Sequence, residues 1–387
     1  MNIAELLAGY DGFGERRTGS AGDHAAAGWL RDLATGAGAA ASLVPVAFQR
    51  FVPGAAWLEA EGRRIEGLPL FDGGLTEGIA GAIGPLGSAA PIGVAEMEPR
   101  AASLPGNAFA QARHDSRHAA IVVALRTRPD SLAPLNAHDA DHPFGPPVLQ
   151  VAGREAAWLM ALAARGAPGR LAATGTRAPG LSHTVRAALP GAAPPLLLLT
   201  PRTSWWTSTA ERSGGVVAWL TALEALAAAP RARAVVALAT CGHELGHLGA
   251  HQAFAAEPAL ASDSALAIHL GANLGCAGTG RLVVRSNVPG LADGMADALV
   301  AAGHPRAPLE VATGGKANGE AHEIEVRGGR YLSLIGDNPW FHTPEDRWPH
   351  SVEVTRVETI ARAVTAMAIK AAQGRGVTLP SAPAGGR

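Results

Sequence analysis

The segment His243-Glu244-Leu245-Gly246-His247 has the residue types and spacing of a zinc-binding motif. On a helix, two histidines four residues apart share one face and hold zinc, with the glutamate as general base. Here the segment follows an apolar run at 234–240, which is typical of a buried strand. Glycines at 242, 246 and 249 also disfavour a helix interior. We therefore expect these residues at the C-terminal end of a strand, where open α/β sheets place their active sites.

Glu211, Glu244 and His342 each follow a predicted strand or lie in a strand-to-helix loop. Because such loops leave a parallel sheet at the same edge, the three side chains can meet despite their separation in sequence. Two carboxylates and one imidazole suit a single zinc ion and leave a fourth position open for water or substrate. Taken singly, Glu211 would pair with Arg212 or Arg202, and His342 would cap a loop. The coincidence of all three favours a site.

Other groups near these positions could also take part in a site. His243 can act as a general base, because an unperturbed imidazole has a pKa of about 6.5. His269 is either a further ligand, a neighbour of the ligands, or a packed histidine. His247 shares a face with His243 only if their segment is helical. Three tryptophans of the same loops either line a substrate pocket or pack in the ordinary way: Trp205, Trp206 and Trp340. A nucleophilic Cys241 is disfavoured, since nothing in the sequence orients His243 toward it.

The elements that must position these groups alternate between strand and helix from residue 185 onward. Strands are expected at 196–199, 234–240, 265–270 and 331–335, and helices at 215–229, 248–256, 290–302 and 352–372. This alternation predicts an α/β fold with a mostly parallel sheet flanked by helices. Residues 46–182 differ, because short candidate strands at 55–61, 119–125, 148–151 and 170–174 lie between turns rich in Gly and Pro, which indicates a β-rich domain. Ser20 is expected to cap an N-terminal helix, and 374–387 is expected to be a flexible tail.

Composition narrows the class of protein. The net charge of −1, without a dense basic run, argues against partners such as nucleic acid or an anionic membrane surface. Two cysteines, Cys241 and Cys276, fit a reducing compartment, so we expect a cytoplasmic protein. The start lacks the pattern of a signal peptide, and no apolar run approaches the ~20 residues of a membrane span. A monomer or a small homo-oligomer is expected.

The order of several segments resembles the family of zinc aminopeptidases that includes the glutaminyl cyclases. Residues 17–22 resemble the family's opening segment, and 46–182 resemble its inserted protease-associated domain. Residues 244–249 look like its Glu-Glu-x-Gly-x-x-Gly block, and 341–346 like its terminal His block. The resemblance implies an aminopeptidase-like α/β domain built from 1–45 and 183–373, with the β-rich domain inserted at 46–182.

The sequence departs from that family at several metal-ligand positions. Pro201-Arg202-Thr203 replaces the family's first His ligand and the Asp two residues later, Glu211 aligns with the bridging Asp, and His243 aligns with the general-base Glu. The last Asp ligand aligns with Gly271 or His269. The resemblance therefore excludes a two-metal site and leaves Glu211, Glu244 and His342, which match the single-zinc positions of glutaminyl cyclases. His322 resembles a family loop position near the active site.

These observations predict a single-zinc hydrolase of a small amide or peptide. Glu211, Glu244 and His342 would be the ligands and His243 the base, while zinc would polarise the carbonyl. The missing family ligands favour an alternative, a non-catalytic relative that binds a ligand or partner in the same cleft. A third possibility is acyl transfer on the glutaminyl-cyclase pattern, which needs only one zinc ion.

Overall fold

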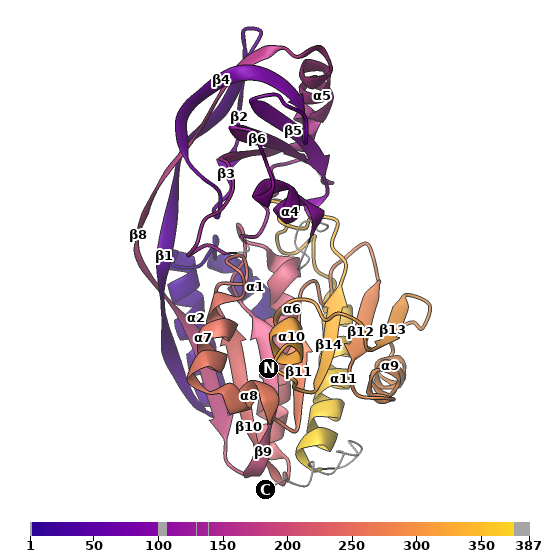
Figure 1. The fold of residues 1–387 in the computed structure, drawn as a ribbon. Helices are drawn as coiled ribbons and strands as arrows, with labels where there is room; N and C mark the ends of the chain where they lie inside the picture. Colours follow the sequence, from indigo (N-terminus) through magenta and orange to yellow (C-terminus); the bar gives the residue numbers. More distant parts are fainter. Residues whose placement is uncertain (1, 100–106, 129, 138, 375–387) are drawn as a thin grey trace, which may run out of the picture.

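The computed structural model describes residues 2–99, 107–128, 130–137 and 139–374. Within these residues one continuous 14-stranded sheet runs through both the lower and the upper part of the molecule (Figure 1). The predicted tail at 374–387 lies outside the described residues, apart from Gly374.

The lower part of the sheet confirms the mostly parallel α/β arrangement. Its strand order is β13-β12-β14-β11-β9-β10-β8. Neighbouring strands among β9, β10, β11 and β14 pair in parallel, whereas β12 runs antiparallel to β14, and β8 runs antiparallel to β10. The bounds of these strands are β8 Pro168–Leu189, β9 Ala192–Pro201, β10 Arg233–Thr240, β11 Leu266–Leu270, β12 Leu282–Ser286, β13 Leu309–Thr313 and β14 Tyr331–Gly336.

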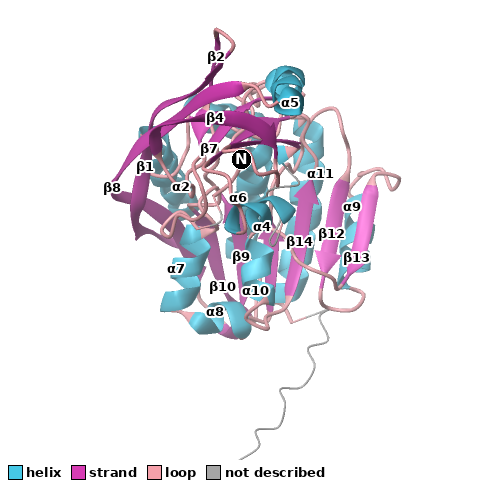
Figure 2. Cartoon of the chain, turned by 45° about the horizontal axis from the view of Figure 1, so that its top comes forward, coloured by secondary structure: helices cyan, strands magenta, loops and turns pink. Residues whose placement is uncertain are grey.

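Helices cover both faces of this part of the sheet. Successive side chains of a strand point to opposite faces, so a strand that is apolar throughout presents a surface to bury on each face. Leu196 and Leu198 of β9 pack into one core, with α1 Ile3–Gly12, α2 Ala21–Gly36, α6 Thr209–Ala228, α9 Leu291–Ala301 and α11 Val354–Ala372. Leu197 and Leu199 pack into the other, with α7 Leu248–Ala256, α8 Pro258–Ser262 and α10 Glu320–Glu325 (Figure 1 and Figure 2). As predicted, Ser20 caps α2, and its side chain accepts a hydrogen bond from the Asp23 N–H.

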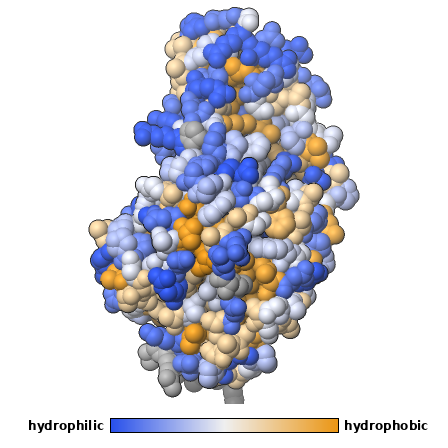
Figure 3. All heavy atoms as spheres, turned by 180° about the vertical axis from the view of Figure 1, so that it is seen from behind, coloured by the Kyte–Doolittle hydropathy of each residue, from blue (hydrophilic) through white to orange (hydrophobic). Residues whose placement is uncertain are grey.

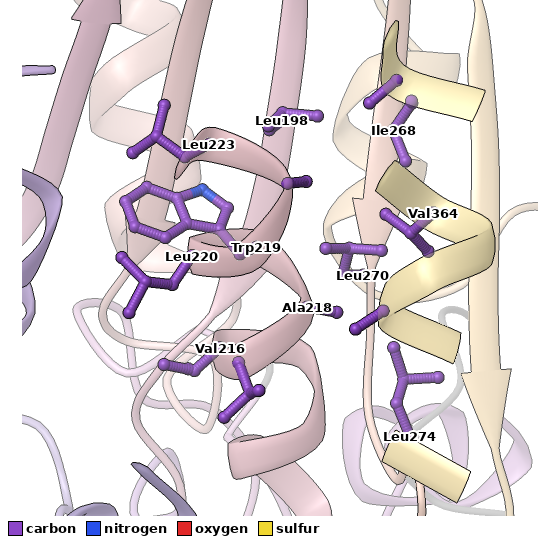
Figure 4. Packing of buried hydrophobic residues seen from close by; sticks show 14 of the residues in the cluster. Leu198, Val216, Ala218, Trp219, Leu220, Leu223, Ile268, Leu270, Leu274 and Val364 are labelled. Atoms are coloured by element: carbon purple, nitrogen blue, oxygen red, sulfur yellow. The ribbon is translucent and has the colours of Figure 1, made fainter. Parts of the chain in front are cut away.

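Helix α6 is buried on nearly all sides. Trp219, Leu220 and Leu223 lie along it, and Leu270 of β11 and Val364 of α11 pack close by in the same core (Figure 4). The helix begins at Thr209, six residues before the predicted start at Gly215, because the distant carboxylate of Asp346 accepts hydrogen bonds from the N–H groups of Ala210 and Glu211. Glu211 therefore lies in the first turn of a helix and not in the predicted loop.

Gly214 gives a test of how closely α6 approaches the chain around it. A Cβ atom at this position would lie 1.5 Å from the carbonyl oxygen of Leu274, which is backbone and cannot turn aside. We expect Gly214→Ala to lower the free energy of unfolding by at least about 1–3 kcal/mol. The measurement is urea denaturation. Gly28, in helix α2, is the matched control, since a Cβ there meets nothing within 4 Å. Gly28→Ala should instead be neutral or stabilising, by up to about 1 kcal/mol. Equal losses for both variants would contradict the close approach.

The upper part of the molecule is formed by residues between two long strands, β1 and β8, which pair antiparallel over most of their length (Figure 1). The predicted domain boundaries lie opposite one another, because Val46 of β1 pairs with Ser182 of β8. The strands predicted at 55–61 and 170–174 are parts of β1 and β8.

The bounds of the elements in this upper part are β1 Ala40–Ala60, β2 Arg63–Glu66, β3 Leu68–Pro69, β4 Thr76–Pro85, β5 Ile92–Met97, α4 Ala108–His114, β6 Ala120–Leu125, β7 Val148–Ala152, the 3-10 turn η1 Gly153–Glu155 and α5 Ala156–Arg165. That residues 46–182 form a protease-associated domain stays a prediction.

The surface opposite the view of Figure 1 mixes residue types. Its hydrophobic residues form small patches separated by hydrophilic ones (Figure 3). Among the described residues, none of the helices combines the length and the apolar character that crossing a bilayer requires.

Candidate metal centre at the edge of the sheet

The segment after β10 is a turn and not a helix, as its glycines predict. Gly242 and Gly246 have φ angles of +74° and +76°, and His247 also adopts a left-handed conformation, with φ of +61°. The backbone therefore reverses within the motif. It brings the rings of His243 and His247 to a centroid distance of 5.1 Å. The expectation that these histidines meet only on a helix is wrong, because a tight turn achieves the same approach.

His243, His247 and Glu320 form the one group of three potential metal ligands in the described parts of the chain whose ligand atoms all lie within 4.8 Å of one another. We call these three residues the His–Glu group. His243 Nδ1 lies 2.9 Å from Glu320 Oε1, which α10 brings across from the next layer. Glu320 is fully buried, whereas the two histidines are partly exposed. One buried carboxylate and two accessible imidazoles are a donor set that zinc accepts.

Further polar residues hold this group in place. His269, on β11, lies with Nε2 3.3 Å from Glu320 Oε2, and its Nδ1 is 2.8 Å from the hydroxyl of Ser333. His247 Nδ1 lies 3.1 Å from Glu323 Oε1, and Arg327 donates a hydrogen bond of 2.8 Å to the other oxygen of Glu323. Contacts of this kind fix the orientation of imidazole rings that bind metals.

The electrostatic environment keeps the carboxylates ionised. Burial alone would raise the pKa of Glu320, but His243, His269 and His247 outweigh it and hold that pKa well below its usual range. Burial and the positive charge of Arg212 lower the pKa of His243 to about 4, against the opposing influence of Glu320. His243 is therefore neutral near neutral pH, which is the form that binds a metal. Burial would lower the pKa of His247, but its hydrogen bond to Glu323 raises it overall.

A pocket opens beside the His–Glu group. It has a volume of about 90 Å³ and is lined by His243, His247, Glu320 and His269 together with Asn136, Gly271, Ala272, Asn273, Asn318, Gly319, Ile335 and Phe341. The predicted tryptophans do not line this pocket. Trp205 is buried and donates a hydrogen bond to Asn136, Trp206 donates one to the carbonyl of His342, and Trp340 packs edge-on against His350.

The structure brings two of the three predicted zinc ligands together. Glu211 Oε1 lies 3.4 Å from His342 Nε2, and both side chains are fully buried. The same oxygen accepts a hydrogen bond of 2.6 Å from Arg212 Nη2. Arg212 and His342 together hold the pKa of Glu211 far below its usual range, although burial would raise it. A guanidinium therefore already neutralises this carboxylate.

The third predicted ligand, Glu244, has other partners. Its Oε1 accepts a hydrogen bond of 2.6 Å from the N–H of Thr18, and its Oε2 accepts one of 2.9 Å from the hydroxyl of Thr203. Burial raises its pKa despite these hydrogen bonds. Glu244 does not join Glu211 and His342 in a group of three ligand atoms within 4.8 Å. The residues of this predicted set thus do not fit a zinc ion in the arrangement that the structure shows.

Several backbone positions around the cleft are strained. Apart from Glu61, the non-glycine residues with positive φ in the described ranges are Trp206, Ser208, His247, Asn273 and His342, all in loops or helix ends at this edge of the sheet. Each such position costs on the order of 1–3 kcal/mol, and such residues cluster at functional sites. The strain supports a functional edge at the place that the sequence indicates.

Sequence reasoning missed Glu320 and Glu323, whereas it named Arg212 as an alternative partner of Glu211, and the structure confirms that pairing. Glu320 lies two residues before His322, the residue that resembles a family loop position, but His322 contacts Glu325 at 3.7 Å and does not belong to the His–Glu group. A signal was present, since Glu320 and Glu323 are spaced three apart and face the same side of a helix. Nothing local indicated that this helix packs against the turn after β10.

Comparisons with known proteins agree with the fold. Neither protein-family models nor curated proteins give a match. A zinc aminopeptidase from Bacillus subtilis superimposes with a TM-score of 0.74 at 16% identity, covering 98% of this chain and 96% of that one. A Peptidase M28 precursor from Shewanella amazonensis gives 0.76 at 17% identity, covering 98% and 94%. A glutaminyl cyclase from Porphyromonas gingivalis gives 0.51 at 12% identity, covering 94% and 96%. Over nearly its whole length, this chain therefore has the fold of the M28 zinc aminopeptidases and of a glutaminyl cyclase.

Proposed function

We propose that this protein is a metal-dependent hydrolase of small amides or short peptides, with one divalent ion held by His243, His247 and Glu320. The observation that carries the proposal is the His–Glu group beside a pocket, at the sheet edge where α/β folds place their sites. The aminopeptidase-like fold supports the same reaction class. A cytoplasmic location remains part of the proposal and rests on the sequence alone.

The residues around the group have distinct roles in this proposal. A bound ion would polarise the substrate carbonyl and stabilise the charge that develops on its oxygen. His243 serves as a ligand and not as the predicted base, because its pKa of about 4 makes it a weak proton acceptor. Glu323 orients His247, and Ser333 orients His269. Asn136 and Asn318 of the pocket wall offer amide groups that can bind the polar ends of a substrate.

Zinc analysis of the protein, purified without a metal-binding tag, tests the proposal. We expect about one ion per chain. His247→Gln should lose it and should abolish amine release from amino-acid anilides. His322→Gln is the matched control, since it changes a histidine nearby that lies outside the group, and it should keep both ion and activity. A wild-type protein that contains no metal and gains none on adding zinc would rule the proposal out.

The pairing of Arg212 with Glu211 favours a second candidate, a binding protein without catalysis. The guanidinium of Arg212 neutralises the Glu211 carboxylate, as a bound metal ion would. A protein that has lost the metal ion at this position is expected to have such a pair. This candidate predicts no turnover of amides even when the His–Glu group holds an ion. Peptides with an N-terminal glutamine belong in the same assay, because their cyclisation would reveal the acyl transfer on the glutaminyl-cyclase pattern.

A further inference from the structure

Glu211 and His342 present two metal-ligating atoms to each other inside the protein. His342 Nδ1 lies 2.6 Å from the carbonyl oxygen of Pro134. Because a carbonyl only accepts hydrogen bonds, Nδ1 carries the proton. The other ring nitrogen, Nε2, faces Glu211 Oε1 at 3.4 Å. Nε2 is buried and makes no hydrogen bond. Both side chains are fully buried, so the charge of the Glu211 carboxylate needs a cation beside it.

Arg212 supplies that cation. Its side chain is 1% exposed and reaches Glu211 Oε1 with Nη2 at 2.6 Å. Its Nε donates a hydrogen bond of 2.9 Å to the carbonyl of Thr203, which fixes the guanidinium from the other side. Its Nη1 is buried and has no hydrogen-bond partner. The guanidinium thus donates hydrogen bonds to one carboxylate and one carbonyl, and one of its nitrogens has no partner. Its five N–H donors are therefore only partly satisfied.

We infer that Arg212 is a built-in cation, in the place of a metal ion beside Glu211 and His342, and that removing its charge creates a second divalent-cation site there. Glu211 Oε1 and His342 Nε2 would be the first two ligands of the new site. Ser204 already donates a hydrogen bond of 2.7 Å to Glu211 Oε2 and would keep the carboxylate oriented. The ion proposed for the His–Glu group shares none of these ligands, but the charge of Arg212 also acts on His243. A variant that removes Glu211 as well is therefore needed to assign an added ion to this site.

The experiment compares wild-type protein with Arg212→Met, which keeps the length of the side chain and removes its charge. Both are loaded with zinc, freed of excess metal and analysed for zinc content and melting temperature. Arg212→Met should hold about one zinc ion more than the wild type, and zinc should raise its melting temperature by several degrees more than it raises that of the wild type. The double variant Arg212→Met/Glu211→Gln should lose the added ion.

Arg202→Met is the matched control. Arg202 is equally buried and also pairs with a buried carboxylate, that of Asp23, at 2.5 Å. The other oxygen of Asp23 accepts hydrogen bonds from the Gly19 N–H and the Ser182 hydroxyl, which are donors and not metal ligands. Arg202→Met should therefore gain no zinc. A gain equal to that of Arg212→Met would overturn the inference, because it would show nonspecific binding to any uncovered carboxylate.

Two further results separate this inference from the proposed function. If wild-type protein contains no zinc, and Arg212→Met gains one ion that the double variant Arg212→Met/Glu211→Gln lacks, the proposed function fails and the inference holds. An unchanged zinc content in folded Arg212→Met overturns it. If Arg212→Met does not fold, Glu211→Gln in the wild-type background decides. Its zinc content should equal that of the wild type, and a loss would show that Glu211 already binds the ion.

Discussion

Replacing Glu320 by glutamine is expected to have the largest effect on metal binding. The carboxylate contacts His243 and His269 at once and is the one anion of the His–Glu group. Glutamine keeps the size but removes the charge, and it presents an amide N–H₂ where an ion needs an acceptor. Loss of an outer-shell partner already costs about 10–100-fold in metal affinity, so loss of this ligand should exceed that range. Titration calorimetry with zinc measures the change.

Glu325→Gln serves as the control for the Glu320 variant. Glu325 lies on the same short helix, but its oxygens accept hydrogen bonds from the Tyr331 hydroxyl and the Ala317 N–H, away from the group. It should bind zinc as the wild type does. Zinc affinity unchanged in Glu320→Gln would remove Glu320 from the site. An equal loss in both variants would point to a general disturbance of α10.

Asp23→Asn is expected to have the largest effect on stability. Asp23 is fully buried and pairs with Arg202, whose side chain is 1% exposed. Breaking a buried ion pair leaves the remaining charge uncompensated, which costs about 3–5 kcal/mol. The pair also ties α2 to the start of the loop after β9, because Arg202 donates further hydrogen bonds to the carbonyls of Asp23 and His183. Chemical denaturation, followed by far-ultraviolet circular dichroism, gives the loss.

The exposed pair between Arg165 and Glu61 provides the comparison. Its nitrogen–oxygen distance of 2.6 Å resembles that of the buried pair, but both side chains are about half exposed. Solvent screens such pairs, so Glu61→Gln should leave stability almost unchanged. If Asp23→Asn were as mild as Glu61→Gln, burial would not govern the energetics of Arg202, and its role as a structural cation would have to be abandoned.

Some features of the site follow from local sequence. The strand before Cys241 was predictable because its run of apolar residues permits a fully buried strand. The turn after it was predictable because Gly242 and Gly246 adopt positive φ without the clash that a Cβ brings. The start of α6 was not predictable, since the hydrogen bonds that extend it come from Asp346, 136 residues away from Ala210. That carboxylate has its pKa raised to about 6 by burial, which its hydrogen bonds oppose.

The amino-acid sequence by itself determined the alternation of strands and helices and the edge of the sheet at which polar side chains gather. Both depend on the periodicity of neighbouring residues and on the shared direction of parallel strands. Only the tertiary structure decided which of those side chains meet. Glu320 reaches His243 across 77 residues. Of the two partners that the sequence allowed for Glu211, the structure selects Arg212, while Arg202 pairs with Asp23. Such pairings depend on how the layers pack and on the free-energy cost of burying an unpaired charge. A local sequence pattern predicts neither of these.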